Sequence, residues 1–464
     1  MPFDLAALLD QHRGAGATIF NEHVNPKWGQ ALKLIGYDRA YVRAEGAYLW
    51  DAHGNRYLDL IGGYAVCNVG RNHPVVRKAL IDYLESNAPS MVQFETPVLA
   101  GALAKELKKR VGRDLDRVFF TNSGTEGIEA AIKFARCATK RPVMLSEHSA
   151  FHGLSTGALA MNGCASFREG FEPFPSEFRA VPFGDLAALE RELARGDVAG
   201  FVVEPIAGKG VHFHAAGFLA EASQLCHKHG ALFIVDEVQT GVGRTGTFLA
   251  IDQEGAVEAD MVVMSKALSG GYVPVGAVLC RTDIWEKVFS RLDRAIVHSS
   301  TFHMGGLAMV AGLAVLSVYD EERLAERAIE SGAQLRVALE SMMARFELMG
   351  AVRQRGLMLG IEFHKPRSLA LGVAWRMVHA LDANLFTQAI TMPLMAEHRI
   401  LSQVAGHAMP VLKLTPPLAL SSDDGAYFLS AFEQTMIGLH RFPGPGWAVL
   451  RRMAGNALGT PSRV

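Results

Sequence analysis

An apolar run ends in two carboxylates in the stretch Leu232-Phe-Ile-Val-Asp-Glu-Val-Gln239. Four consecutive large apolar residues predict a short strand that is buried on both faces, as strands of a parallel sheet are. Asp236 and Glu237 then stand at the carboxyl end of this strand, the edge of an α/β sheet where ligands bind. A buried Asp there needs a cationic partner or several hydrogen-bond donors. The stretch predicts a ligand site at the sheet edge, with a structural ion pair as the alternative.

Similar apolar runs recur through the middle of the chain, at residues 118–121, 143–146, 201–203, 261–264 and 275–279. Helical patterns, such as those of residues 126–136 and 217–229, separate them. This alternation predicts a large α/β domain with parallel strands and helices on both faces of the sheet. At the ends of the chain, residues 48–57 predict a hairpin and residues 358–363 a further strand. We expect an N-terminal segment (1–60) that joins a smaller α+β domain (341–464), with the large domain (61–340) between them.

The chain has 464 residues, and its net charge of −1 argues against nucleic acid or an anionic membrane as the main partner. The five cysteines include no C-x-x-C pair, so we expect no disulfide framework and a reducing, cytoplasmic location. The His-x-His pairs in residues 212–214 and 227–229 lack a third ligand, so no metal site is expected. No secretory signal is visible, and residues 307–318 are too few to cross a bilayer, which predicts a buried helix there.

Two further stretches carry groups that suit a cofactor. Thr121-Asn-Ser-Gly-Thr-Glu126 follows an apolar run and opens a helix, where free N–H groups and hydroxyls bind phosphate; an ordinary helix cap is the alternative. Lys266 follows another apolar run in Met264-Ser-Lys-Ala-Leu-Ser-Gly-Gly271, where burial makes an amine nucleophilic; a surface lysine is the alternative. A phosphate cradle, Asp236 and Lys266, in this order, form the set that pyridoxal 5′-phosphate needs.

With these motifs the chain resembles the class III pyridoxal-phosphate aminotransferases of fold type I, over residues 20–420. The motifs that carry the resemblance are Gly46-x-Tyr-Leu-Trp-Asp-x-x-Gly54, Gly70-x-Asn-His-Pro74, Asn122-Ser-Gly-Thr-Glu126, Phe151-His-Gly153, Val203-Glu-Pro-Ile206, Asp236-Glu-Val-Gln239, Gly241-Val-Gly-Arg-Thr-Gly246, Lys266, Ser300-Thr-Phe302 and Pro416-Pro-Leu418. The resemblance implies a fold type I transferase of the α/β class, with a mainly parallel seven-stranded sheet in the large domain.

The resemblance also implies the contacts of the cofactor. The expected contacts are phosphate binding by Ser123, Gly124 and Thr125, ring packing by Phe151 and Val238 with His152 in the same motif as Phe151, a polar network of Glu204 and Gln239, pairing of the ring nitrogen with Asp236, and a Schiff base with Lys266. Thr301 is expected to bind the phosphate of a neighbouring subunit, which implies a homodimer with shared active sites.

Transamination is the activity that the resemblance implies. Lys266 holds the cofactor as an internal aldimine, an incoming amine displaces it, and the freed lysine moves a proton as general base and then as general acid. An oxo acid then takes the amino group by the reverse sequence, so ping-pong kinetics are expected.

Two residues depart from the pattern of the ornithine and 4-aminobutyrate types. Lys413 stands where those members have an Arg that grips a substrate carboxylate, and Lys209 stands where they have the Glu that pairs with this Arg. If both lysines face the pocket, their repulsion is expected to lower one pKa or to draw in an anion. We expect Tyr64, Lys209, Arg244 and Lys413 to line the substrate pocket, with bracing of a Gly-rich loop as the alternative role of Arg244.

Residues 364–415 are long and apolar, and resemble members that act on long-chain amines or aldehydes. We therefore expect transfer of an amino group between a bulky or long-chain aliphatic amine (or aldehyde) and a small 2-oxo acid such as pyruvate or 2-oxoglutarate. The core of the small domain is the alternative role of this segment. The alternative functions are an ornithine- or 4-aminobutyrate-type transaminase, an aminomutase of the same fold, and a non-catalytic cofactor-binding regulator.

Overall fold

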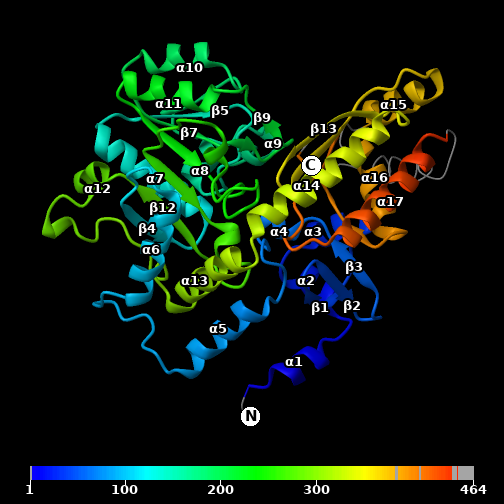
Figure 1. Cartoon of the computed structure of the whole chain (residues 1–464), viewed down its shortest axis with the longest axis horizontal. Coiled ribbons are helices and arrows are strands. Elements are labelled where there is room, and N and C mark those ends of the chain that lie inside the picture. Colours follow the sequence, from blue (N-terminus) through cyan, green and yellow to red (C-terminus); the bar gives the residue numbers. More distant parts are fainter. Residues whose placement is uncertain (1–2, 382–384, 407–408, 442–446, 448–464) are drawn as a thin grey trace.

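The structure is a computed structural model and describes residues 3–381, 385–406, 409–441 and 447. A seven-stranded sheet forms its centre (Figure 1). Its strands, in spatial order, are β4 (Arg117–Thr121), β12 (Gly276–Cys280), β11 (Met261–Met264), β10 (Leu232–Asp236), β7 (Val198–Val203), β5 (Val143–Glu147) and β6 (Phe178–Val181). β12 runs antiparallel to both of its neighbours, while the pairs from β11 to β6 are all parallel. The expected mainly parallel α/β sheet is confirmed.

Apolar side chains project from both faces of the central sheet, because successive residues of a strand point to opposite sides. Val263 of β11 packs in the core cluster that contains the buried side of α7 (Gly124–Thr139), whereas its neighbour Val262 packs in the larger cluster on the other face. The elements that contribute to this larger cluster include α5 (Pro74–Glu85), α6 (Val98–Val111), α10 (Leu186–Leu193), α11 (Phe218–Lys228) and α13 (Gly306–Glu321). The sheet is therefore covered by helices on both faces.

The helix expected at residues 307–318 is α13, and eight of its residues are buried. Its apolar residues therefore belong to the core. No helix in the described residues is long and apolar enough to cross a membrane.

Two four-stranded sheets lie beside the central sheet, and each joins distant parts of the chain. The first contains β1 (Tyr41–Glu45), β2 (Tyr48–Asp51), β3 (Arg56–Asp59) and β15 (Ile400–Leu401). The second contains β13 (Met349–Arg355), β14 (Met358–Phe363), β17 (Val411–Leu414) and β16 (Gln403–Val404). Pairing of β3 with β15 joins the N-terminal hairpin to the C-terminal part of the chain. The domain boundaries after residues 60 and 340 stay predictions.

The turn of the N-terminal hairpin is held by Asp51, whose Oδ1 accepts from the N–H groups of His53 and Asn55 at 2.9 Å each.

The helices beside the second sheet are α14 (Leu324–Met343), α15 (Leu369–Leu381), α16 (Leu385–Ala396) and α17 (Ser422–Leu439) (Figure 1). The other elements are α1 (Leu5–Gln11), α2 (Gly16–His23), α3 (Pro26–Leu34), α4 (Gly62–Ala65), α8 (Thr156–Ala160), α9 (Ala165–Arg168), β8 (Ile206–Ala207), β9 (His212–Phe213) and α12 (Thr282–Val288).

Part of the apolar segment at residues 364–415 belongs to the core. Phe386, Ile390 and Leu394 on α16 are each fully buried. Gln388 of the same helix and residues 403–406 line a cavity instead. Residues 382–384 and 407–408 of this segment lie outside the described residues.

Candidate functional site

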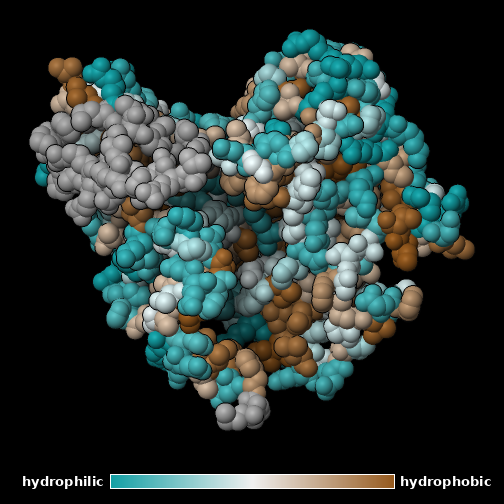
Figure 2. Space-filling model, turned by 180° about the vertical axis from the view of Figure 1, so that it is seen from behind, coloured by the Kyte–Doolittle hydropathy of each residue, from teal (hydrophilic) through white to brown (hydrophobic). Residues whose placement is uncertain are grey.

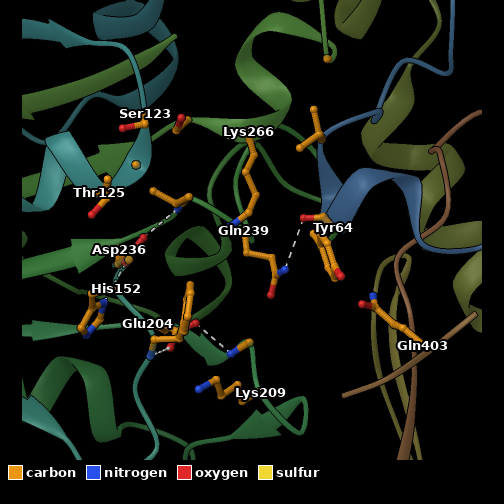
Figure 3. Close-up of a pocket in the computed structure, with 18 of the residues that line it drawn as sticks. Tyr64, Ser123, Thr125, His152, Glu204, Lys209, Asp236, Gln239, Lys266 and Gln403 are labelled. Carbon is orange, nitrogen blue, oxygen red and sulfur yellow. Dashed lines mark hydrogen bonds and ion pairs between the residues drawn. The ribbon is translucent and has the colours of Figure 1, made fainter. Parts of the chain in front are cut away.

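A cavity of about 1170 Å³ opens where the carboxyl ends of the central strands face the C-terminal sheet. Polar side chains enter it from the β4–α7 turn, from the ends of β7, β10 and β11, and from β17. Figure 3 shows Ser123 and Thr125 on one side, Asp236 and His152 below them, and Lys266 extending into the cavity above Gln239. Five separate motifs thus converge on one place, the edge of the sheet at which a ligand was expected.

The N-terminus of α7 faces the cavity and suits an anion. Ser123 caps this helix, and its hydroxyl accepts from the N–H of Glu126 at 3.3 Å. The first intrahelical bond runs from Gly127 N to Ser123 O, so the N–H groups of Gly124 and Thr125 precede the hydrogen-bonded ladder. Free N–H groups at the positive end of a helix bind phosphate. The capping role and the phosphate-binding role of Ser123-Gly-Thr125 are therefore compatible.

Two glycines allow close packing around this turn. A Cβ on Gly124 would stand 2.8 Å from Cγ1 of Val238, and a Cβ on Gly153 would stand 2.4 Å from Oγ1 of Thr125. Gly153 also has a φ of +119°, which disfavours any other residue. Val238 therefore packs directly against the helix terminus.

Asp236 is the carboxylate that faces the cavity, and His152 orients it from behind. Asp236 Oδ2 lies 2.8 Å from His152 Nδ1, and Oδ1 accepts from Val238 N at 3.0 Å. Burial alone would lower the pKa of His152, but the hydrogen bond and charge of Asp236 raise it overall. Nε2 of His152 is buried without a partner in the described residues. The neighbouring Glu237 turns away, because it accepts from Ile251 N at 3.0 Å and from the Thr240 hydroxyl.

Glu204 connects two walls of the cavity. Its carboxylate accepts from Phe151 N at 3.0 Å and from Gly208 N at 2.8 Å. Burial is the main cause of the raised pKa of Glu204, which the charge of Asp236 reinforces. Glu204 thereby fixes the backbone that carries Phe151.

Lys266 follows β11 and is held in a backbone conformation with a φ of +40°, which is unusual for a residue with a side chain. Burial lowers the pKa of Lys266, against the opposing charges of Asp236 and Glu204. A lowered pKa increases the fraction of neutral amine, which is the form that attacks a carbonyl.

Lys413 on β17 is buried, with 5 % of its surface exposed. Its Nζ donates to Gly208 O at 2.5 Å and to Gln239 Oε1 at 2.7 Å. Burial, followed by the charge of Lys266, lowers the pKa of Lys413 to about 7. Lys209 also lines the cavity, and burial lowers its pKa. Both pKa values are therefore lowered as one was expected to be, but burial is the main cause rather than mutual repulsion.

Arg244 does not line the cavity, so its expected place in the substrate pocket is wrong. Its guanidinium is fully buried and donates to Leu357 O at 2.9 Å, to Pro416 O at 2.6 Å and to Asn68 Oδ1 at 2.5 Å. Arg244 thus braces the Gly-rich loop against three distant segments, which was the alternative role.

The structure brings together the other residues expected at the site, with one exception. Tyr64 lines the cavity and is 57 % exposed. Thr301 lies outside the lining of this cavity, in an exposed turn. Its neighbour Ser300 accepts from Asn122 Nδ2 at 2.8 Å, which places the turn near the α7 terminus. The role of Thr301 toward a second subunit stays a prediction.

Sequence reasoning missed several lining residues. They are Phe167, Gly208, Tyr272, Gln388 and Gln403. None belongs to a motif, and the C-terminal residues reach the cavity only because β16 and α16 fold over it. The position of Gly208 beside Lys209 was the one available signal.

The site fits pyridoxal 5′-phosphate on the observations above. A helix N-terminus offers donors to a phosphate, Asp236 offers an anion to the protonated ring nitrogen, and Lys266 offers a buried amine to the aldehyde. Phe151 and Val238 supply apolar walls on the same cavity.

Comparison with known proteins agrees with this geometry. A model of the family "Aminotransferase class-III" matches residues 35–436. The aminotransferase PigE of a Serratia species is 33% identical over 446 residues, which cover 89% of this chain and 52% of PigE. The chain therefore spans about half the length of that relative. Acetylornithine aminotransferase of Methanopyrus kandleri is 41% identical over 322 residues, covering 69% of this chain and 80% of that protein.

Solved structures show the same fold. An (S)-enantioselective omega-transaminase from Thermomicrobium roseum matches with a TM-score of 0.78 at 26% identity, covering 95% of this chain and 100% of that one. Ornithine aminotransferase from Toxoplasma gondii matches with a TM-score of 0.77 at 28% identity, covering 87% of this chain and 91% of that one.

Proposed function

The chain belongs to the class-III aminotransferases, and we propose that it transfers an amino group between a bulky or long-chain aliphatic amine (or aldehyde) and a small 2-oxo acid. The observation that carries this choice of substrate is the set of hydrogen bonds that Lys413 makes within the protein. It stands where an ornithine-type enzyme is expected to have a carboxylate-binding Arg, and its ammonium is already held by Gly208 and Gln239. No arginine lines the cavity within the described residues.

Class-III aminotransferases use pyridoxal 5′-phosphate, which supplies the electron sink for proton removal from the amine-bearing carbon. When this group is bound, the α7 terminus would hold its phosphate, and Asp236, oriented by His152, would hold its ring nitrogen in the protonated form. Phe151 and Val238 would enclose its ring. Lys266 Nζ would serve as the general base and general acid that moves the proton of the amine-bearing carbon of the substrate. Its lowered pKa suits this two-way transfer.

The wall of the cavity also supports an apolar amine. Tyr64, Val66, Phe167 and Val404 lie on it, and its polar C-terminal members are the uncharged amides of Gln388 and Gln403 together with Lys413, whose Nζ is engaged by Gly208 and Gln239. Glu204 and Asp236 are the carboxylates among the described lining residues, and both are occupied by the contacts given above. A second amino group on the substrate, such as that of ornithine, would therefore find no free acid.

A homodimer with shared sites, located in the cytoplasm, is part of the same proposal. Large apolar side chains around Thr301 are exposed, with Leu292 at 97%, Ile296 at 81% and Phe302 at 64%. Such exposure along one segment, residues 292–302, favours a protein partner. Figure 2 shows hydrophobic side chains beside a hollow on one face of the molecule. Sedimentation of the holoenzyme would give a dimer mass, and a monomer that retains full activity would contradict the shared site.

The proposal is tested by the dependence of turnover on an added oxo acid. A transaminase consumes one equivalent of pyruvate or 2-oxoglutarate for each amine that it converts. An aminomutase, the alternative of the same fold, isomerises a single substrate without any acceptor. Steady-state turnover of an aliphatic amine that stops without oxo acid supports the proposal, whereas undiminished turnover would contradict it.

A further inference from the structure

Lys209 is a cavity lysine whose ammonium lies mainly against aromatic rings. Its Nζ lies 4.3 Å from the centre of the Phe167 ring and 4.9 Å from that of Phe151, and 3.5 Å from Asn162 Oδ1. The Cys164 thiol is a further neighbour. The side chain is half-buried and lies on the lower wall of the cavity in Figure 3. An ammonium over two aromatic rings is stabilised by them, but it keeps donors for an anion.

The other two lysines of the cavity already have a role or a partner. Lys266 reacts with the cofactor, and Lys413 donates hydrogen bonds to Gly208 O and Gln239 Oε1. If Lys413 turned toward a substrate carboxylate, both of these acceptors would lose their partner, which costs free energy in a buried place. Lys209 loses less when it turns, because its polar contacts among the described residues are the long one to Asn162 Oδ1 at 3.5 Å and one to the partly exposed Cys164 thiol.

We propose that Lys209 binds the carboxylate of the 2-oxo acid, while the amine donor is bound without it. This inference rests on the proposed function, because it divides one cavity between an apolar substrate and an anionic one. In the acceptor half-reaction the carboxylate replaces a long contact to an amide oxygen with a short, charge-assisted hydrogen bond. In the donor half-reaction the ammonium stays over Phe167 and Phe151, so an apolar amine need not desolvate an uncompensated charge.

The place of Lys209 favours this role over a structural one. Phe151 is held against the cavity by Glu204, so a cation above Phe151 lies close to the place where the reacting groups meet. Phe167 is 38% exposed, so the second ring that Lys209 covers is partly open to solvent.

The test measures the two half-reactions separately on holoenzyme, by following the absorbance of the bound cofactor in a stopped-flow instrument. K209M retains the length of the side chain and removes its charge. We expect the second-order rate constant for pyruvate to fall about 10- to 100-fold, because one charge-assisted hydrogen bond is lost. The rate constant for hexylamine should change less than about 3-fold by the same reasoning. K209R, which keeps the charge, should recover most of the pyruvate rate.

An aldehyde acceptor provides the matched control, since hexanal has no carboxylate. K209M should transfer its amino group to hexanal at the wild-type rate. Propionate, which cannot react, gives a readout independent of turnover: it should bind wild-type holoenzyme in competition with pyruvate, and K209M should bind it at least about 10-fold more weakly. Equal losses with pyruvate and hexanal, or unchanged propionate binding, would overturn the assignment of Lys209. Failure of the wild type to react with hexylamine would instead refute the proposed function.

Discussion

The ammonium of Lys413 lies 2.7 Å from Oε1 of Gln239 and fixes the direction of that amide. A lysine can only donate, so the oxygen of Gln239 must face it. The amide nitrogen is then turned the other way, and it donates to Tyr64 O at 3.3 Å. The second four-stranded sheet thus reaches through β17 to Gln239, in the segment after β10, and sets which group Gln239 presents to the cavity.

Replacement of Lys413 by Met should change the cofactor environment as well as the rate. K413M leaves Gly208 O and Gln239 Oε1 without their donor, so kcat/KM should fall about 10- to 100-fold. The loss of a neighbouring positive charge should also raise the pKa at which the absorbance of the Lys266 adduct titrates. Spectrophotometric titration of the holoenzyme checks this. An unchanged titration would mean that Lys413 acts through packing alone.

Lys413 should also make stability depend on pH. Its pKa is about 7 in the folded protein and 10.5 in the reference state, so between these values the unfolded chain binds more protons. Stability therefore rises as pH rises through this window, by at most about 1.4 kcal/mol per pH unit from this group. Urea unfolding of the holoenzyme at pH 7, 8 and 9 should show a smaller rise for K413M than for the wild type. Equal slopes for the two proteins would refute the lowered pKa.

The two adjacent carboxylates should differ sharply in their effect on activity. D236N removes the anion that faces the ring nitrogen and should lower kcat by at least about 100-fold. E237Q is the matched control, because Glu237 faces Thr240 and Ile251, and burial raises its pKa to about 7. The control should retain kcat within about 3-fold, since a neutral side chain already suits its surroundings. Steady-state kinetics of both variants measures the two kcat values. A similar loss of kcat in each variant would contradict the assignment of Asp236.

Arg244 should matter for stability and not for substrate binding. R244M leaves Leu357 O, Pro416 O and Asn68 Oδ1 without a donor, and should lower the free energy of unfolding by about 3 kcal/mol or more. The KM for the amine should stay the same at a temperature where the variant is folded. A raised KM at unchanged thermal stability would return Arg244 to the substrate pocket.

The strands and the reactive residues could be predicted because they are encoded locally. Apolar runs mark β10 and β11, and the polar residues directly after them form the site. The reversed direction of β12 could not be predicted, since an apolar run looks the same in either orientation. Contacts between residues far apart in the sequence could not be predicted either: Lys413 and Gln239 are 174 residues apart, and Arg244 and Pro416 are 172 apart. A motif position alone therefore could not separate the bracing Arg244 from the cavity-lining Lys413.

The most direct measurement is a single half-reaction on purified holoenzyme without any oxo acid. A long-chain aliphatic amine and ornithine are mixed with it separately, and loss of the absorbance of the Lys266-bound cofactor is followed. We expect the aliphatic amine to convert the cofactor and ornithine to do so much more slowly, because Lys413 is already engaged. Conversion by ornithine alone would mean that Lys413 does bind a substrate carboxylate, and would contradict the proposed substrate class.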